Sequence, residues 1–259
     1  MNSKLFLLLL SFILVKATIG QEISKSDIVR FKVKSITTID GDGKTKYTKF
    51  YNDKGDFIKQ SSPNDSKQLQ TDSELSYNDS SQLIEERTYT SNGDVNATSK
   101  YYYNAKNQLS KREYIQFGEV SGTWTFEYDD KGNKISETQT SGTMGNTLTN
   151  YKYDDKGFLV QEDKSNNTIG KEERVNYKYN INGQIIEKKT KAYYFNTTIT
   201  LTFSYNETGK LIKLFEKSSN GVSSTTLYKY NDNGLLISDI WESSISKTPH
   251  TTTYQIAYE

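Results

Sequence analysis

One short pattern recurs along most of the chain at nearly constant spacing. Each copy begins with a tyrosine followed by Asn or Asp, and Gly stands four positions after the tyrosine in six copies. Successive copies lie 25 or 26 residues apart. The eight copies begin at Tyr51, Tyr77, Tyr103, Tyr128, Tyr153, Tyr179, Tyr205 and Tyr230. A fixed period of this length is typical of a repeat architecture in which each unit is one supersecondary element.

The residue types within each copy are those of a tight turn. An Asn or Asp side chain accepts a hydrogen bond from the backbone two residues on, and Gly adopts the left-handed conformation of a type I turn with a G1 bulge. The sixth position after the tyrosine is apolar in seven copies, and Lys134 is the exception. Each copy therefore predicts the tip of a β-hairpin.

A second turn must reverse the chain between successive tyrosines. Candidates are Asn92–Gly93, Phe117–Gly118, residues 142–146, Asn166–Asn167 and Asn220–Gly221. Each period then holds two strands of about eight residues. We add a first hairpin across residues 40–43 and a last strand that ends at Tyr258, which gives seventeen or eighteen strands. The sequence predicts an all-β fold, a continuous curved antiparallel meander that is open or coiled, because a flat sheet of this size is rare.

A second aromatic or large apolar residue precedes most of the repeat tyrosines by two positions. Residues two apart lie on one face of a strand, so these side chains predict a ladder of cross-strand neighbours. Such a thin, aromatic sheet accounts for a mean hydropathy of -0.78 without disorder. The seven residues are Leu75, Tyr101, Phe126, Tyr151, Tyr177, Phe203 and Tyr228. Helix signals are weak after the first twenty residues.

The first twenty residues have the layout of a secretory signal peptide. A basic start up to Lys4 precedes an apolar run, and the small residues Ala17 and Gly20 follow. We expect cleavage after Gly20 or after Ala17, export to the periplasm or the exterior, and no stable membrane span afterwards, because Lys16 interrupts a run too short to cross a bilayer. Residues 21–259 form one predicted domain.

Charge and cysteine content exclude several classes of partner and site. The 33 basic and 32 acidic residues are scattered along the chain, so neither nucleic acid nor a membrane surface is an expected partner. The absence of cysteine removes disulfides, thiolate metal sites and thiol catalysis. Because no nucleotide-binding or metal-ligand motif is present, we expect no cofactor and no metal.

The repeated pattern, Y-[ND]-x-x-G-x-[LI], resembles the YD repeat of the RHS family from Phe50 to about Glu242. The resemblance implies tandem hairpins joined into a ribbon that coils into a shell, and an association with carbohydrate binding and cell surfaces. Large members of that family cleave themselves at an Asp-Pro bond, whereas Pro63 and Pro249 follow Ser62 and Thr248 here. The resemblance therefore extends to the architecture rather than to toxin delivery.

Catalytic residues are not expected. His250 is the single histidine, and we expect it to be exposed near a turn. A glycoside hydrolase needs only two carboxylates, and acidic residues do recur after the hairpins. Because they repeat with the structural period, they are expected to lie on the solvated face of the strands and to pair with opposite charges there. These residues are Glu85, Glu86, Glu137, Glu162, Glu187 and Asp239.

Aromatic residues outside the repeat consensus are the best candidates for ligand binding, because the repeat tyrosines are used by the fold. The candidates are Trp124, Tyr114, Tyr194 and Trp241. The sequence thus favours an exported, non-catalytic repeat protein with a binding or structural surface, for glycans or cell-envelope components. The alternatives are a carboxylate-pair glycoside hydrolase and a component of a polymorphic toxin or contact system.

Overall fold

The computed structural model describes residues 23–141 and 145–258. The predicted signal peptide and part of the turn predicted at 142–146 lie outside this range. Within the described residues one helix, α2 (Lys25–Arg30), precedes the strands. The strands are β1 (Val33–Ile39), β2 (Thr45–Tyr51), β3 (Phe57–Pro63), β4 (Leu69–Tyr77), β5 (Leu83–Tyr89), β6 (Val95–Tyr103), β7 (Leu109–Gln116), β8 (Glu119–Tyr128), β9 (Lys134–Ser141), β10 (Thr147–Tyr153), β11 (Leu159–Asn166), β12 (Gly170–Tyr179), β13 (Ile185–Ala192), β14 (Thr197–Tyr205), β15 (Leu211–Ser218), β16 (Ser223–Tyr230), β17 (Leu236–Ser243) and β18 (Ser246–Tyr258).

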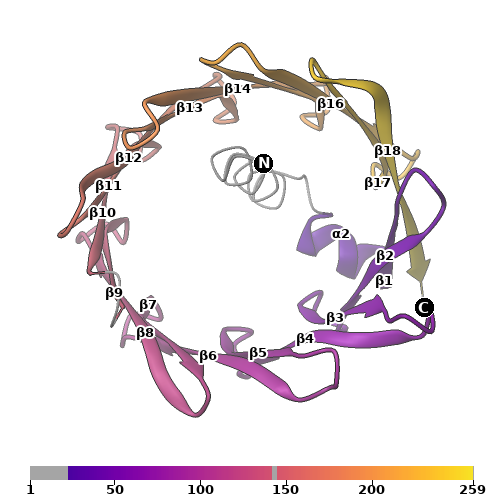
Figure 1. Ribbon diagram of the computed structural model, residues 1–259, viewed down its shortest axis with the longest axis horizontal. Coiled ribbons are helices and arrows are strands. Elements are labelled where there is room, and N and C mark those ends of the chain that lie inside the picture. Colours follow the sequence, from indigo (N-terminus) through magenta and orange to yellow (C-terminus); the bar gives the residue numbers. More distant parts are fainter. Residues whose placement is uncertain (1–22, 142–144, 259) are drawn as a thin grey trace.

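The strands form one 18-stranded antiparallel barrel (Figure 1). Each strand pairs with the next in the sequence, and β1 pairs with both β2 and β18. The predicted antiparallel meander is therefore confirmed, but the sheet closes instead of ending in free edges. Closure places Ile36 of β1 opposite Ile256 of β18. Closing the sheet satisfies the backbone groups that an open sheet would leave at its two edges.

The repeated turns gather at one end of the barrel, which we call the repeat rim. In the turn after β6, the N–H of Asn104 donates to the carbonyl of Gln108 and the N–H of Asn107 to that of Asn104, both over 2.9 Å. The Oδ1 of Asn104 also accepts from the N–H groups of Lys106 and Gln108. Asn107, which stands where most copies have Gly, has a φ of 61°. The predicted turn is confirmed.

The other hairpin turns gather at the opposite end, which we call the flared rim. In Figure 1 the turns of the repeat rim curl toward the barrel axis, whereas several hairpins of the flared rim project outward. The predicted turns at Asn92–Gly93, Phe117–Gly118 and Asn220–Gly221 lie here, and each contains a glycine with positive φ.

Helix α2 was not predicted from the sequence. Ser24 caps it by accepting from the N–H of Asp27, and its six residues are too few to show a helical period. The helix lies inside the barrel wall (Figure 1), where Ile28 is buried against Ile36 and Tyr254. A capping pattern in the sequence could have indicated the start of this helix: Ser24 is followed three residues later by the acidic Asp27 and then by the apolar Ile28.

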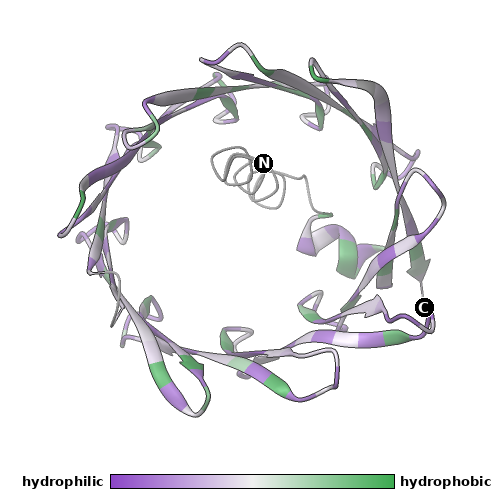
Figure 2. Cartoon of the chain, viewed as in Figure 1, coloured by the Kyte–Doolittle hydropathy of each residue, from purple (hydrophilic) through white to green (hydrophobic). Residues whose placement is uncertain are grey.

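The position of α2 identifies the inner face of every strand. Ile36 and Ile256 contact the cluster around Ile28 and thus point inward, and directly paired residues share a face. Followed around the barrel, the register places the second aromatic of each repeat on the inner face, while residues such as Lys100, Asn176 and Thr200 point outward. In Figure 2 hydrophobic positions are distributed around the wall and do not gather in one central core.

Candidate functional site

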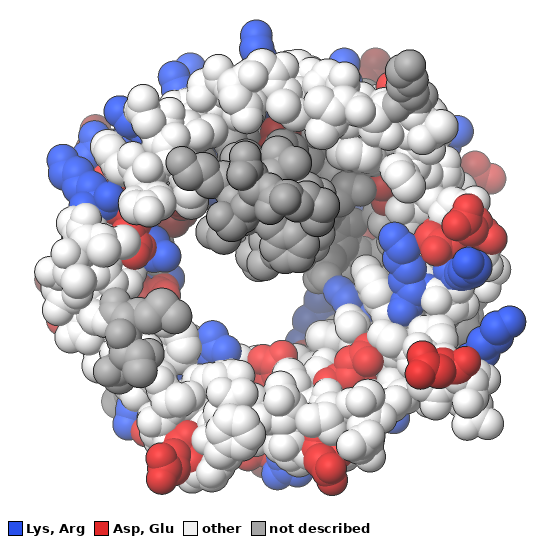
Figure 3. All heavy atoms as spheres, viewed as in Figure 1, with Lys and Arg blue, Asp and Glu red and all other residues white. Residues whose placement is uncertain are grey.

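The barrel encloses a lumen, and Figure 3 shows an open space at its centre. The inner face that lines it combines aromatic rings with carboxylates. Four inner-face tyrosines donate hydrogen bonds from their hydroxyl groups to a carboxylate on a neighbouring strand. The pairs are Tyr101 with Glu86 (3.1 Å), Tyr151 with Glu137 (3.0 Å), Tyr177 with Glu162 (2.5 Å) and Tyr254 with Asp239 (2.6 Å).

These pairs correct the prediction that the recurring acids decorate the solvated face of the strands and pair with opposite charges there. Glu86, Glu137, Glu162 and Asp239 lie on the inner face and bind tyrosine hydroxyls. A tyrosine and the carboxylate paired with it on the adjoining strand lie on the same face of the sheet. The sequence does not show that this face encloses the lumen. Burial and the adjacent carboxylate together raise the pKa of Tyr151 above its usual range.

Two of the recurring acids lie on the outer face and pair with opposite charges, as predicted for a solvated face. Glu85 forms an ion pair with Arg87 over 2.7 Å, and Glu187 forms one with Lys178 over 2.9 Å. The basic partners, Arg87 and Lys178, are well exposed, so these ion pairs contribute little to the stability of the fold.

A hollow of about 220 Å³ opens on the inner face of β9 to β12. Two of the tyrosine-paired carboxylates, Glu137 and Glu162, flank Tyr151 in its wall, and Glu173 contributes a third. Gln139, Thr147, Thr149, Lys164 and Val175 complete the lining. The wall thus offers one aromatic ring, several hydrogen-bond acceptors and donors, and little apolar surface.

The charges around the hollow are partly balanced. Lys164 lies 3.1 Å from Glu172. Lys134, the exception to the repeat pattern, lies 2.8 Å from Glu137 and places its Nζ 4.3 Å from the centre of the Tyr151 ring. Burial raises the pKa of Glu173, which favours its protonated form.

The structure separates the four predicted ligand residues into two groups. Tyr114 and Trp124 lie on the inner face of β7 and β8, where the guanidinium of Arg112 stacks 4.7 Å from the Trp124 ring. Trp241 lies on the inner face of β17, 5.9 Å from the ring of His250. Tyr194 instead stands on the flared rim and is 80% exposed.

His250 is exposed, as expected, but it belongs to β18 rather than to a loop. Its inner-face position opposite Trp241 follows from the register of β17 and β18. Among the described residues, no group of three or more His, Cys, Asp or Glu side chains is arranged to hold a metal ion.

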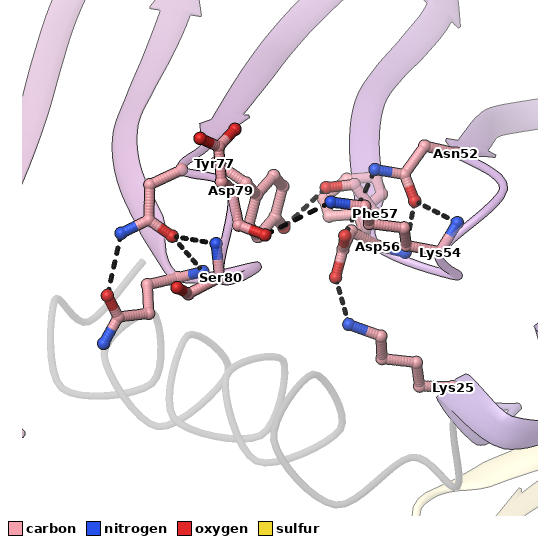
Figure 4. Close-up of polar contacts among 10 residues, drawn as sticks. Lys25, Asn52, Lys54, Asp56, Phe57, Tyr77, Asp79 and Ser80 are labelled. Atoms are coloured by element: carbon pink, nitrogen blue, oxygen red, sulfur yellow. Dashed lines mark hydrogen bonds and ion pairs between the residues drawn. The ribbon is translucent and has the colours of Figure 1, made fainter. Parts of the chain in front are cut away.

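Polar contacts at the repeat rim attach α2 to the barrel (Figure 4). The Nζ of Lys25 forms an ion pair with the buried carboxylate of Asp56. Asn52 donates to the same carboxylate over 3.1 Å. Burial opposes ionisation of Asp56, but these two partners outweigh it and lower its pKa. These contacts connect α2 to the first repeated turn. The carboxylate of Asp56 is thus used in a structural contact.

Tandem hairpins form a closed barrel around a lumen, and this arrangement defines the class of protein as a repeat shell. The chain belongs to the Teneurin YD-shell family, which it matches over residues 21–254. No helix among the described residues is long and apolar enough to cross a membrane. A comparison with curated proteins gave no match.

Several solved structures are similar to the chain, among them these three. A structure described as TcdB2-TccC3-Cdc42 is 11% identical, with a TM-score of 0.38, and the match covers 86% of this chain but only 16% of that one. A porin-like protein from Bacteroides uniformis is 14% identical over 88% of this chain and 97% of its own, with a TM-score of 0.50. A porin-like protein from Bacteroides vulgatus is 10% identical over 88% and 98%, with a TM-score of 0.37. At such identities the Bacteroides uniformis protein supports the barrel fold alone.

Proposed function

We propose that the chain is an exported, non-catalytic repeat shell whose lumen binds a polar ligand, with a glycan as the ligand class that fits best. The observation that carries the proposal is the hollow on β9 to β12, where Tyr151 stands between Glu137 and Glu162. A sugar ring has apolar faces that stack on an aromatic ring and hydroxyl groups that donate to carboxylates. The inner wall supplies both kinds of group side by side.

The tyrosine–carboxylate pairs favour binding over catalysis. Each carboxylate already accepts a hydrogen bond from a tyrosine hydroxyl, as in Tyr151 with Glu137, and this fixes its position before a ligand enters. Fixed polar groups reduce the ordering cost of binding.

A binding assay with a matched control tests the proposal. Tyr151→Ala combined with Glu162→Gln removes the ring and one carboxylate from the hollow. Tyr102→Ala combined with Glu113→Gln removes an equivalent pair from the outer face, where the Tyr102 hydroxyl donates to Glu113 over 2.7 Å. We expect a glycan array to identify a ligand, and calorimetry to show a dissociation constant raised at least about tenfold by the inner pair of changes alone. Equal loss from both pairs, or no retained glycan, contradicts a luminal site.

The carboxylate-pair hydrolase is the second candidate, because Glu137 and Glu162 flank the same hollow. They stand on strands two apart in the sheet, a separation of roughly 9 to 10 Å between strand axes. Glu137 lies opposite Thr149 and Glu162 opposite Tyr151, so the two residues are also offset by two positions along the strands, and their backbones lie farther apart than the roughly 6.5 to 9.5 Å between the carboxyl groups of inverting glycosidases. Release of reducing ends from the bound glycan, abolished by Glu137→Gln and by Glu162→Gln, would support this candidate and overturn the non-catalytic proposal.

Export is part of the proposal and rests on residues 1–20. Fractionation of cells that produce the full chain tests it, with deletion of residues 5–15 as the control. We expect the wild-type protein in the periplasm or the medium, shortened at Gly20 or Ala17 by mass spectrometry. Retention of the uncleaved chain in the cytoplasm would contradict export.

A further inference from the structure

The flared rim exposes apolar side chains at the tips of several separate hairpins. They occur at the β7–β8, β11–β12, β13–β14 and β17–β18 turns. The five residues are Phe117, Ile169, Tyr194, Phe195 and Ile245, and all are exposed. An exposed apolar residue is ordinary by itself, whereas here five of them stand on the hairpin tips of one rim.

The most developed part of this rim combines aromatic and basic side chains. Tyr194 and Phe195 pack edge to face with their ring centres 5.0 Å apart. The Nζ atoms of Lys171 and Lys191 lie 5.9 Å and 5.0 Å from the ring centre of Tyr193, so two neighbouring hairpins meet there. Ile169, 61% exposed, stands on the first of these hairpins. We call Ile169, Lys171, Lys191, Tyr194 and Phe195 the rim patch.

The composition of the rim patch fits the boundary between lipid headgroups and acyl chains. Tyrosine and phenylalanine place apolar rings at that depth, and lysines beside them attract anionic headgroups. The net charge of the whole chain, +1, hides this local arrangement. A second copy docked through the same patch would bring identical lysines together, because a twofold contact repeats the same surface. A fluid bilayer can also surround separate hairpin tips, which present no continuous surface to a protein.

We infer that the flared rim docks on the surface of a bilayer that contains anionic lipid. Ile169, Tyr194 and Phe195 enter the headgroup region, Lys171 and Lys191 bind the anionic headgroups, and Phe117 and Ile245 supply further contacts along the rim. In this orientation the flared rim of the barrel faces the membrane, and the repeat rim with α2 faces away from it. The inference does not depend on what the lumen binds.

Vesicle sedimentation tests the docking, with a control on the opposite rim. The vesicles are phosphatidylcholine alone or with phosphatidylglycerol. Ile169→Ser, Tyr194→Ser and Phe195→Ser are combined in the full chain, and Ile181→Ser, which changes a 94% exposed tip on the repeat rim, is the control. We expect the triple variant to bind the anionic vesicles at least about tenfold more weakly than wild type, with the control unchanged.

Charge reversal tests the role of the lysines separately. Lys171→Glu with Lys191→Glu is expected to weaken binding to the anionic vesicles about tenfold or more, while binding to phosphatidylcholine alone changes little. Added salt is expected to weaken the wild-type interaction with anionic vesicles in the same direction. Equal binding of wild type and both rim variants to the anionic vesicles overturns the inference.

A depth measurement distinguishes the rim from other parts of the chain that contact lipid. Phe195→Trp and Ile181→Trp each add one indole to the same background of Trp124 and Trp241. Lipids brominated on their acyl chains are expected to quench the indole at position 195 and not the one at position 181. Equal quenching at both positions would contradict docking through the flared rim. A dimer in light scattering that the rim-patch substitutions abolish would show that the rim patch binds a second copy of the chain and not a bilayer.

Discussion

The hydroxyl group of Tyr103 donates a hydrogen bond to the backbone carbonyl of Leu83 over 2.8 Å. The two residues are 20 positions apart and belong to successive repeats. The same bond recurs in seven copies, with donors Tyr77, Tyr103, Tyr128, Tyr153, Tyr179, Tyr205 and Tyr230. Each of these seven tyrosines therefore connects its own hairpin to the preceding one, which explains why tyrosine rather than phenylalanine stands at this position.

Removing one of these hydroxyl groups should weaken the contact between two repeats. Tyr103→Phe leaves the carbonyl of Leu83 without this partner, and we expect a loss of about 1 kcal/mol in the free energy of unfolding. Tyr102→Phe is the control, because the Tyr102 hydroxyl bonds to Glu113 in an exposed position, and its loss should cost less than about 0.5 kcal/mol. Urea denaturation measures both; equal effects would contradict the role of the tyrosine bond.

Glycine in the first repeated turn is required for the docking of α2. A Cβ atom at Gly55 would lie 2.9 Å from both the carbonyl oxygen of Lys25 and the Cγ2 of Val29. At Gly157, with a similar positive φ, a Cβ would meet nothing within 4 Å. Gly157→Ala should cost about 1 kcal/mol through the backbone alone, and Gly55→Ala more.

Hydrogen exchange distinguishes these two variants. We expect Gly55→Ala to increase exchange in residues 25–31, since α2 must move, while Gly157→Ala leaves these amides as protected as in wild type. Unchanged protection in both variants would show that α2 is held independently of the turn.

The buried carboxyl of Glu216 should make stability depend on pH. Burial raises its pKa from 4.5 to about 7. Because the folded state then holds the proton more tightly than the unfolded state, the stability contribution is complete below pH 4.5 and decreases as the pH rises to about 7. Glu216→Gln should remove this decrease and stabilise the protein at pH 8, by at most about 3 kcal/mol.

Thermal unfolding between pH 4 and pH 8 measures the effect of Glu216→Gln. Glu207→Gln, in an exposed turn, is the control and should leave the pH profile of stability as it is in wild type. A parallel profile for Glu216→Gln and wild type would mean that Glu216 is ionised in the folded protein at neutral pH.

Restoring the repeat consensus at Lys134 should not stabilise the barrel. Lys134→Leu gives the apolar residue of the other copies, but it removes the 2.8 Å ion pair with Glu137 and the contact with the Tyr151 ring. Because both charged groups are partly exposed, we expect a change of between 0 and about 1 kcal/mol toward lower stability. A double-mutant cycle with Glu137→Gln measures the coupling, and a clear gain in stability from Lys134→Leu would contradict this role.

Local features of the barrel could be predicted from the sequence because they depend on neighbouring residues. The turn at Asn104 needs only an Asx side chain and a residue that tolerates positive φ, and both are visible in the repeat. The shared face of Tyr101 and Tyr103 follows from the period of two along a strand. The hydroxyl bond of Tyr103 was not predicted, because its acceptor is a backbone carbonyl in the preceding repeat.

The candidate site could be predicted only in part. Trp124, Tyr114 and Trp241 were identified as aromatic residues outside the consensus, and the structure places them on the inner face. The recurring acids were assigned to the solvated face of the strands with opposite charges as partners, whereas Glu137 and Glu162 bind tyrosine hydroxyls in the lumen. Alternation divides the residues of a strand between two faces, but it does not show which face will enclose a space.

By itself the sequence determined the repeat unit, its turns and the antiparallel order of the strands, since all of these depend on contacts within one or two periods. Only the tertiary structure decided that β1 meets β18, that α2 packs inside the wall and that one face becomes a lumen. Closure depends on small twists and tilts summed over 18 strands and on the pairing of two ends more than 200 residues apart. The residues of a single repeat therefore do not determine whether the sheet closes.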